Sequence, residues 1–139
     1  MAERLRIYSA RKKSLDFTKR ELARINAEMT RIQGALKDGT PVSGGTNQRE
    51  ERLVNLIMAK MDIESIRKET AAWLLNMEKA IAELDDDEHH ILDAMYINPV
   101  HNAVDKLCAE YFEDRSTIYR RKDRALRHLT YLFYGVLER

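Results

Sequence analysis

The stretch Leu107-Cys-Ala-Glu-Tyr-Phe-Glu-Asp-Arg-Ser-Thr-Ile-Tyr-Arg120 decides the fold, because two helical patterns meet in it across a very short connection. The first pattern runs to about Tyr111, and only residues 112–115 separate it from the second. Asp114, with Thr117 three positions later, is typical of a helix start, where an aspartate accepts a hydrogen bond from an orphan backbone amide. A connection this short predicts a helix-turn-helix. In such modules the second helix contacts DNA bases, and we call it the reader helix.

The predicted reader helix has one apolar face and one polar face. Apolar residues recur at helical spacing and are expected in the core: Ile118, Ala125, Leu126 and Leu129. Arginine offers paired donors to guanine, serine and threonine bond bases or phosphates, and basic residues further along the helix suit phosphates. The candidate DNA-contacting residues are Arg115, Ser116, Thr117, Tyr119, Arg120, Lys122, Asp123, Arg124 and Arg127. Nearby aromatic residues are expected to pack in the core or a dimer interface: Tyr111, Phe112, Tyr131, Phe133 and Tyr134.

Two further helices are predicted upstream of the reader. Asp85 and Glu88 have the spacing of a capping box, and Asn98-Pro99 ends the helix that they start. Asn102, with Asp105 three positions later, is expected to cap the next helix. Residues 85–139 are therefore predicted to form a three-helix DNA-binding domain.

Residues 3–37 and 49–84 are predicted to form two long helices. Apolar residues recur with seven-residue spacing, which is typical of a coiled-coil seam. The seam consists of Leu5, Tyr8, Leu15, Leu22, Ile25, Met29, Ile32 and Leu36 in the first helix, and Leu53, Leu56, Ile63, Thr70, Leu74, Met77, Ile81 and Leu84 in the second, where Ile66 and Trp73 are expected to widen it. Lys12 and Lys19 interrupt it.

The segment 38–48 contains Pro41 and Gly44-Gly45 and is predicted to be a loop. The expected fold is therefore all-α, with an antiparallel, coiled-coil-like hairpin over residues 1–84 followed by the helix-turn-helix domain. A two-helix hairpin has little core of its own. We therefore expect it to mediate oligomerisation, with a dimer favoured.

The net charge of +1 conceals strongly charged segments. Residues 1–24 carry a net charge of +5, residues 25–77 are neutral, residues 78–114 carry −9 and residues 115–139 carry +5. The acidic block at 85–93 would repel DNA, so it indicates that the opposite side of the domain docks.

The quoted stretch, followed by Arg124-Ala-Leu-Arg-His-Leu129, resembles region 4 of bacterial sigma factors. The whole chain, with its hairpin and its Thr-Pro-Val-Ser-Gly-Gly loop, resembles small phage and prophage transcriptional regulators of the RinA/ArpU type. This resemblance implies promoter binding, control of late phage genes, a bacterial cytoplasm as the compartment and host RNA polymerase as a possible partner. The chain departs from the sigma pattern at three positions, since Phe112 replaces the usual glycine, Glu113 an aliphatic residue and Arg121 an apolar one.

Enzymatic, metal and membrane functions find no support in the sequence. Cys108 is the only cysteine, which excludes an intramolecular disulfide and a thiolate zinc cluster. The adjacent His89 and His90 diverge by about 100° on a helix and cannot easily share an ion. The sequence has neither a phosphate-binding glycine loop nor an apolar run of about 18 residues. We therefore expect a soluble intracellular protein without a cofactor.

Two other functions remain open. A phage small terminase subunit also combines a helix-turn-helix with oligomerising helices, and it would assemble as a ring. A protein-only adaptor that binds RNA polymerase or a sigma factor would use the hairpin as its working surface and would have no affinity for DNA.

Overall fold

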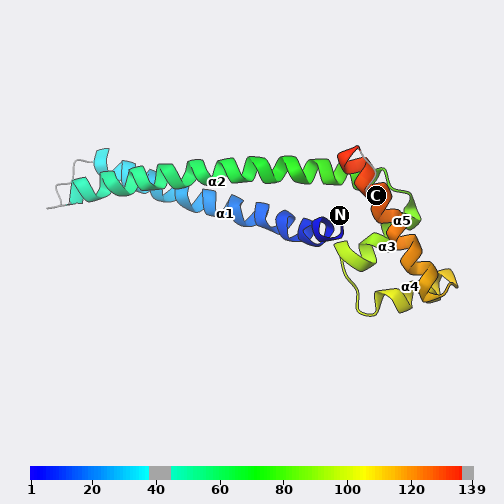
Figure 1. Ribbon diagram of the computed structural model, residues 1–139. Helices are drawn as coiled ribbons and strands as arrows, with labels where there is room; N and C mark the ends of the chain where they lie inside the picture. The colour runs from blue at the N-terminus through cyan, green and yellow to red at the C-terminus, as the bar shows by residue number, and fades with distance from the viewer. Residues whose placement is uncertain (38–44, 136–139) are drawn as a thin grey trace. The chain divides into compact units, whose positions relative to one another are not determined.

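The computed structural model describes residues 1–37 and 45–135, and within these ranges the chain is helical without a strand. The expected all-α fold is confirmed. The elements are α1 (Ala2–Lys37), α2 (Gly45–Ala82), α3 (Asp86–Leu92), a π-helical turn η1 (Asp93–Ile97), α4 (Ala103–Tyr111) and α5 (Arg115–Tyr134) (Figure 1).

The packing divides the chain into two compact units. The hairpin unit comprises residues 13–71, and the C-terminal unit comprises residues 1–12 together with 72–139. The start of α1 and the end of α2 thus pack with the C-terminal helices. The sequence predicts two domains that meet between residues 84 and 85. The packing units do not test whether these domains fold independently, so this boundary stays a prediction.

Within the hairpin unit, the segments of α1 and α2 that belong to it lie side by side (Figure 1). Ile25 and Ile32 are buried, and Glu28 Oε1 lies 2.7 Å from Arg52 Nη2 across the two helices. The half-buried residues Leu15, Leu22, Met29, Leu53, Leu56 and Ile63 complete this part of the predicted seam. The seam is therefore used within one chain.

The predicted loop over 38–48 is too long at its C-terminal end, because α2 begins at Gly45. The first amides of a helix have no intrahelical acceptor, so a glycine there interrupts no hydrogen bond of the helix interior. Residues 38–44 of the predicted loop, including Pro41, lie outside the described residues.

The core of the C-terminal unit is built where α3 and α4 pack against α5. Ile91, Leu107 and Ile118 are almost completely buried and lie in one cluster with Ala94. Ala125 and Leu129 are fully buried and Leu126 is half-buried, so the predicted inward face of α5 is confirmed.

The first turns of α1 complete the C-terminal unit. Leu5 and Met77 are fully buried. Tyr8 Oη donates to Glu78 Oε1 over 3.1 Å, and Ser9 Oγ donates to the carbonyl oxygen of Ile97 over 2.8 Å. Ser9 therefore joins the start of α1 to η1, and Tyr8 joins it to the end of α2.

Arginine and aromatic side chains also join three helices of this unit. The Arg11 guanidinium lies 4.3 Å from the ring centroid of Trp73, and the Arg4 guanidinium lies 5.2 Å from that of Tyr134. Between them, Phe133 contacts Trp73 and Tyr134 with centroid distances of 6.2 and 4.7 Å. We call these five residues the arginine–aromatic ladder. Two arginines of the basic N-terminal segment, Arg4 and Arg11, are therefore used in packing within this unit.

Two predicted helix ends lie where expected but differ in their local geometry. The helix that starts at Asp86 ends near Asn98 as expected, but its last turn is a π-turn in which the Asn98 amide donates to the Asp93 carbonyl. Asn102 precedes α4 but makes no side-chain cap, because its φ of 53° is left-handed, whereas a capping residue is normally extended. Asp105 pairs with Arg115 instead of completing a cap.

Candidate nucleic-acid interface

The turn between α4 and α5 has the backbone conformation that glycine favours. Phe112 adopts φ +54° and ψ 42°, and its amide donates to the carbonyl of Cys108. A left-handed residue after the last helical turn satisfies carbonyls at the helix end. Phe112 therefore takes a conformation that glycine adopts without steric cost. Its side chain is 94% exposed, so it does not pack in the core of the chain, and the expected alternative of a dimer interface stays a prediction.

Asp114 fixes the start of α5, as the sequence predicts. Its Oδ1 accepts hydrogen bonds from the Thr117 amide at 2.8 Å and from Ser116 Oγ at 3.1 Å. These bonds, first those from Thr117, hold the pKa of the Asp114 carboxyl below its usual value of 3.8. The predicted capping box of Asp85 and Glu88 is also present, with both reciprocal bonds formed.

Two of the three departures from the sigma pattern compensate each other. Arg121 Nη2 donates to Glu113 Oε1 over 2.8 Å, and Arg121 Nε lies 2.7 Å from Glu113 Oε2. The guanidinium also lies 5.0 Å from the ring centroid of Tyr111. A pair of unlike charges thus replaces a pair of apolar residues and joins the turn to α5.

Two predicted DNA-contacting cations are already paired within the module. Arg115 Nη1 donates to Asp105 Oδ1, which ties the start of α5 to α4. Lys122 Nζ lies 2.6 Å from Asp123 Oδ1 and 5.6 Å from the ring centroid of Tyr119, and its side chain is only 19% exposed. Arg115 is therefore suited to holding α5 on α4, and the half-buried Lys122, which is paired within α5, is poorly placed to read bases.

Three other arginines of α5 are exposed: Arg120, Arg124 and Arg127. Among the described residues, no carboxylate forms an ion pair with any of them. Arg120 Nε makes only a long 3.4 Å bond to the carbonyl of Ser116 in its own helix. These side chains carry cationic donors that are available to a ligand.

The exposed residues of α5 form one continuous stripe. Residues three and four apart share a helix face. The stripe consists of Ser116, Arg120, Asp123, Arg127, Tyr131 and Tyr134, and we call it the α5 outer stripe. Arg124 and the half-buried Thr117 lie along one edge of it, and Tyr119 lies toward the other. Tyr131 and Tyr134 were expected in the core or a dimer interface, but they are 49 and 45% exposed, and their spacing from Arg127 places them on the same face as that residue.

Carboxylates of the acidic block on α3 form contacts with α4 and α5. His128 Nδ1 lies 2.8 Å from Glu88 Oε1, which links α5 to the cap of α3. Tyr111 Oη donates to Asp87 Oδ1 over 3.1 Å. Burial, and then this bond, raise the pKa of Tyr111 to about 12. The carboxylates therefore stabilise the packing of α3 on α4 and α5.

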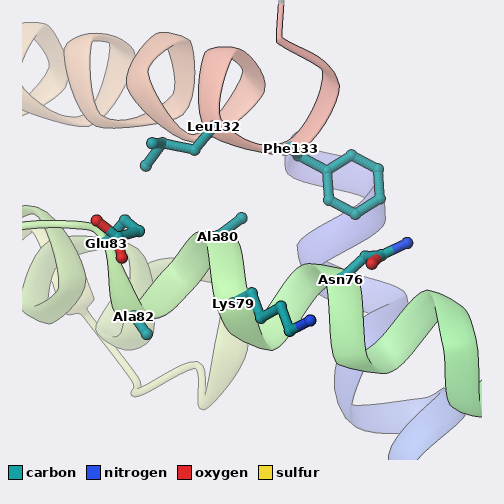
Figure 2. A pocket seen from close by; sticks show the side chains of 7 residues that line it. All are labelled: Asn76, Lys79, Ala80, Ala82, Glu83, Leu132 and Phe133. Carbon is teal, nitrogen blue, oxygen red and sulfur yellow. The ribbon is translucent and has the colours of Figure 1, made fainter.

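No group of three potential ligand residues in the described part of the chain is arranged to hold a metal ion. A cavity of about 550 Å³ lies between the end of α2 and the end of α5, where Leu132 and Phe133 extend toward α2 (Figure 2). It includes no residue of the α5 outer stripe. Within residues 1–37 and 45–135, no helix has the length and hydropathy needed to cross a membrane.

Comparison with known proteins yields one match. No curated protein and no solved structure is significantly similar to the chain. A protein family does match residues 34–130, which include the last turn of α1, all of α2 to α4 and most of α5. This match covers more than two thirds of the sequence, so the chain belongs to the family described as "Protein of unknown function (DUF1492)".

Proposed function

We propose that the protein binds specific sequences in double-stranded DNA through α5 and regulates transcription. The observation that carries the proposal is the α5 outer stripe. It displays arginines without carboxylate partners on the second helix of a helix-turn-helix. In such modules the N-terminal half of this helix enters the major groove.

The pairing of the cations suggests separate roles. Arg120 lies in the second turn of α5, where a guanidinium can donate two hydrogen bonds to one guanine. Arg127 is two turns further along and suits a phosphate, which positions the protein without reading sequence. Arg115 would contribute mainly by holding α5 on α4, and Lys122 by its contacts within α5.

The resemblance to sigma region 4 and to RinA/ArpU-type regulators supports a promoter as the target. Under this proposal the protein acts in the cytoplasm of a bacterial host on phage or prophage genes, with host RNA polymerase as a possible partner. The described residues offer no arrangement that favours an enzymatic reaction over binding.

The test is selection of bound sequences from random duplex DNA with the full chain, followed by affinity measurements on the selected site. We expect Arg120→Ala to lose roughly 1–3 kcal/mol on that site and to relax the preference at one or two base pairs. Arg127→Ala should weaken binding to all sequences alike and lower the slope of log affinity against log salt by about one.

Arg31→Ala is the matched control, because Arg31 is an exposed arginine of the hairpin unit that is paired with Glu28. It should change neither affinity nor preference. If Arg120→Ala behaves like this control, α5 does not dock as proposed. If the unaltered chain fails to bind any duplex at about 50 mM salt, the proposal is wrong and the adaptor function takes its place.

A further inference from the structure

The side of α2 that faces away from α1 carries a second apolar stripe. Val54, Ile57, Met58 and Met61 have the spacing i, i+3, i+4 and i+7, which places them on one helix face. They are 55, 39, 60 and 64% exposed. At about 100° per residue, they lie opposite the seam residues Leu56 and Ile63. The hairpin unit therefore leaves a contiguous apolar surface uncovered.

This apolar stripe has an acidic rim. Four exposed carboxylates flank it, and none forms an ion pair among the described residues: Glu50, Glu51, Asp62 and Glu69. Within the hairpin unit, Lys68 is the one cation among the described side chains on that side of α2, and Lys79 follows on the same side in the C-terminal unit. A partner that covers the stripe must therefore bring positive charge.

The outward side of α1 has the complementary character. Lys13, Phe17, Arg20 and Arg24 follow one another at helical spacing on the face away from the seam. Phe17 is 66% exposed. Arg24 pairs with Glu21 one turn earlier, while Lys13 and Arg20 form no ion pair among the described residues. This face offers one large apolar side chain between cations, with the exposed carboxylate of Asp16 at its edge.

We propose that the α2 apolar stripe of one copy binds the basic α1 face of a second copy, with Phe17 seated on Met58 and Met61. Unlike charges then surround an apolar centre, as in specific interfaces. Contact between two α2 stripes would instead bring carboxylates together, which is unfavourable. The association surface is thus distinct from the seam, which is used within the chain.

The two faces lie on opposite sides of the hairpin unit, since each points away from the other helix. The contact is therefore heterologous, with different surfaces on the two partners. Such contacts close into a ring or grow as an open chain, in contrast to a two-fold dimer. The proposal consequently replaces the expected dimer with a larger assembly.

The experiment measures the mass of the full chain by analytical ultracentrifugation at about 50 µM. The unaltered chain should exceed a dimer, while Phe17→Glu and Met58→Glu should each weaken association about tenfold or more and give monomers. The two variants mixed in equal amounts should form a 1:1 complex that grows no further. Phe17→Glu retains a working α2 stripe, and Met58→Glu retains a working α1 face.

Ile66→Glu is the matched control, because Ile66 is 57% exposed on α2 but lies about 130° around the helix from the stripe. Its assembly should be unchanged, and far-UV circular dichroism should show that all three variants are folded. Charge reversal provides an independent route. Lys13→Glu with Arg20→Glu should abolish assembly, and Glu50→Lys with Glu51→Lys in the same chain should restore it.

Three results would overturn the proposal. One is a monomeric unaltered chain at this concentration. Another is a Phe17→Glu chain that assembles while Met58→Glu does not, which would indicate contact between α2 stripes. The third is a mixture of the two variants that stays monomeric. DNA affinity need not be measured, so these outcomes are independent of the proposed DNA-binding function.

Discussion

Phe112 has an unfavourable backbone conformation and an exposed aromatic ring. Its left-handed φ of 54° is unfavourable for a bulky side chain with a Cβ atom. Its ring is 94% exposed, so it gains almost no burial energy. Strained residues of this kind cluster at functional sites, so we expect the exposed ring to serve a contact rather than the folding of the turn.

Phe112→Gly should therefore raise the free energy of unfolding by about 1 kcal/mol, because glycine adopts positive φ without steric cost. Urea denaturation followed by circular dichroism measures the change. Phe112→Ala is the control, since alanine keeps the Cβ atom and should give little gain. A loss of stability in the glycine variant would mean that the exposed ring contributes packing that the structure does not show.

At the scale of the helix, α5 depends on Asp114 for its start. The carboxylate accepts bonds from Thr117 and Ser116, and these bonds lower its pKa below 3.8. A carboxyl group with a lowered folded pKa stabilises the protein fully above its unfolded pKa. This contribution disappears as the pH falls through the lower folded pKa.

Asp114→Ala should lower Tm by about 3–5 °C at pH 7 through loss of the cap. The difference in Tm between the variant and the unaltered chain should shrink as the pH falls below 3.8. Thermal melts across this pH range provide the measurement. Asp16→Ala, at an exposed position within α1, should show no such dependence. A gap that stayed constant with pH would contradict the assigned role of the carboxylate.

Helix starts could be predicted from the sequence where the capping geometry is local. Asp114 lies three residues before Thr117, whose amide donates to it, so spacing alone was informative. Asn102 has a similar spacing but a left-handed backbone, and the sequence gives no sign of that φ. The pairing of Arg121 with Glu113 was also hidden, because it depends on how the turn folds back on α5. The pairing of the α5 arginines therefore depends on tertiary contacts and could not be predicted from the sequence.

At the scale of the whole molecule, heptad spacing predicted the long helices but not how they are shared between the units. Leu5, Leu74 and Met77 belong to the same apolar pattern as the rest of the seam, yet they pack in the C-terminal unit. A repeat shows which residues face a partner but not which partner they face. The arginine–aromatic ladder was missed for the same reason, since its residues come from three separate helices.

This sharing predicts that residues 85–139 will not form a stable domain alone. The fragment lacks the donor of the Ser9–Ile97 bond and the Trp73 ring against Phe133, and it exposes the side that Met77 covers. A fragment of about 55 residues already buries a small share of its surface. We expect a broad, non-cooperative urea transition, whereas the full chain should give a sharp change in the fluorescence of the half-buried Trp73.

A fragment of residues 72–139 is the informative comparison, because it restores the end of α2 but not the first turns of α1. It should be intermediate, and adding a peptide of residues 1–12 should raise its denaturation midpoint if the α1 contacts are as strong as the packing implies. The same peptide with Leu5→Asp is the control, since a charge at this fully buried position should prevent docking. A cooperative transition of residues 85–139 with the midpoint of the full chain would show that the long helices contribute nothing to the stability of this unit. In that case the boundary between residues 84 and 85 would be the true limit of the folding unit.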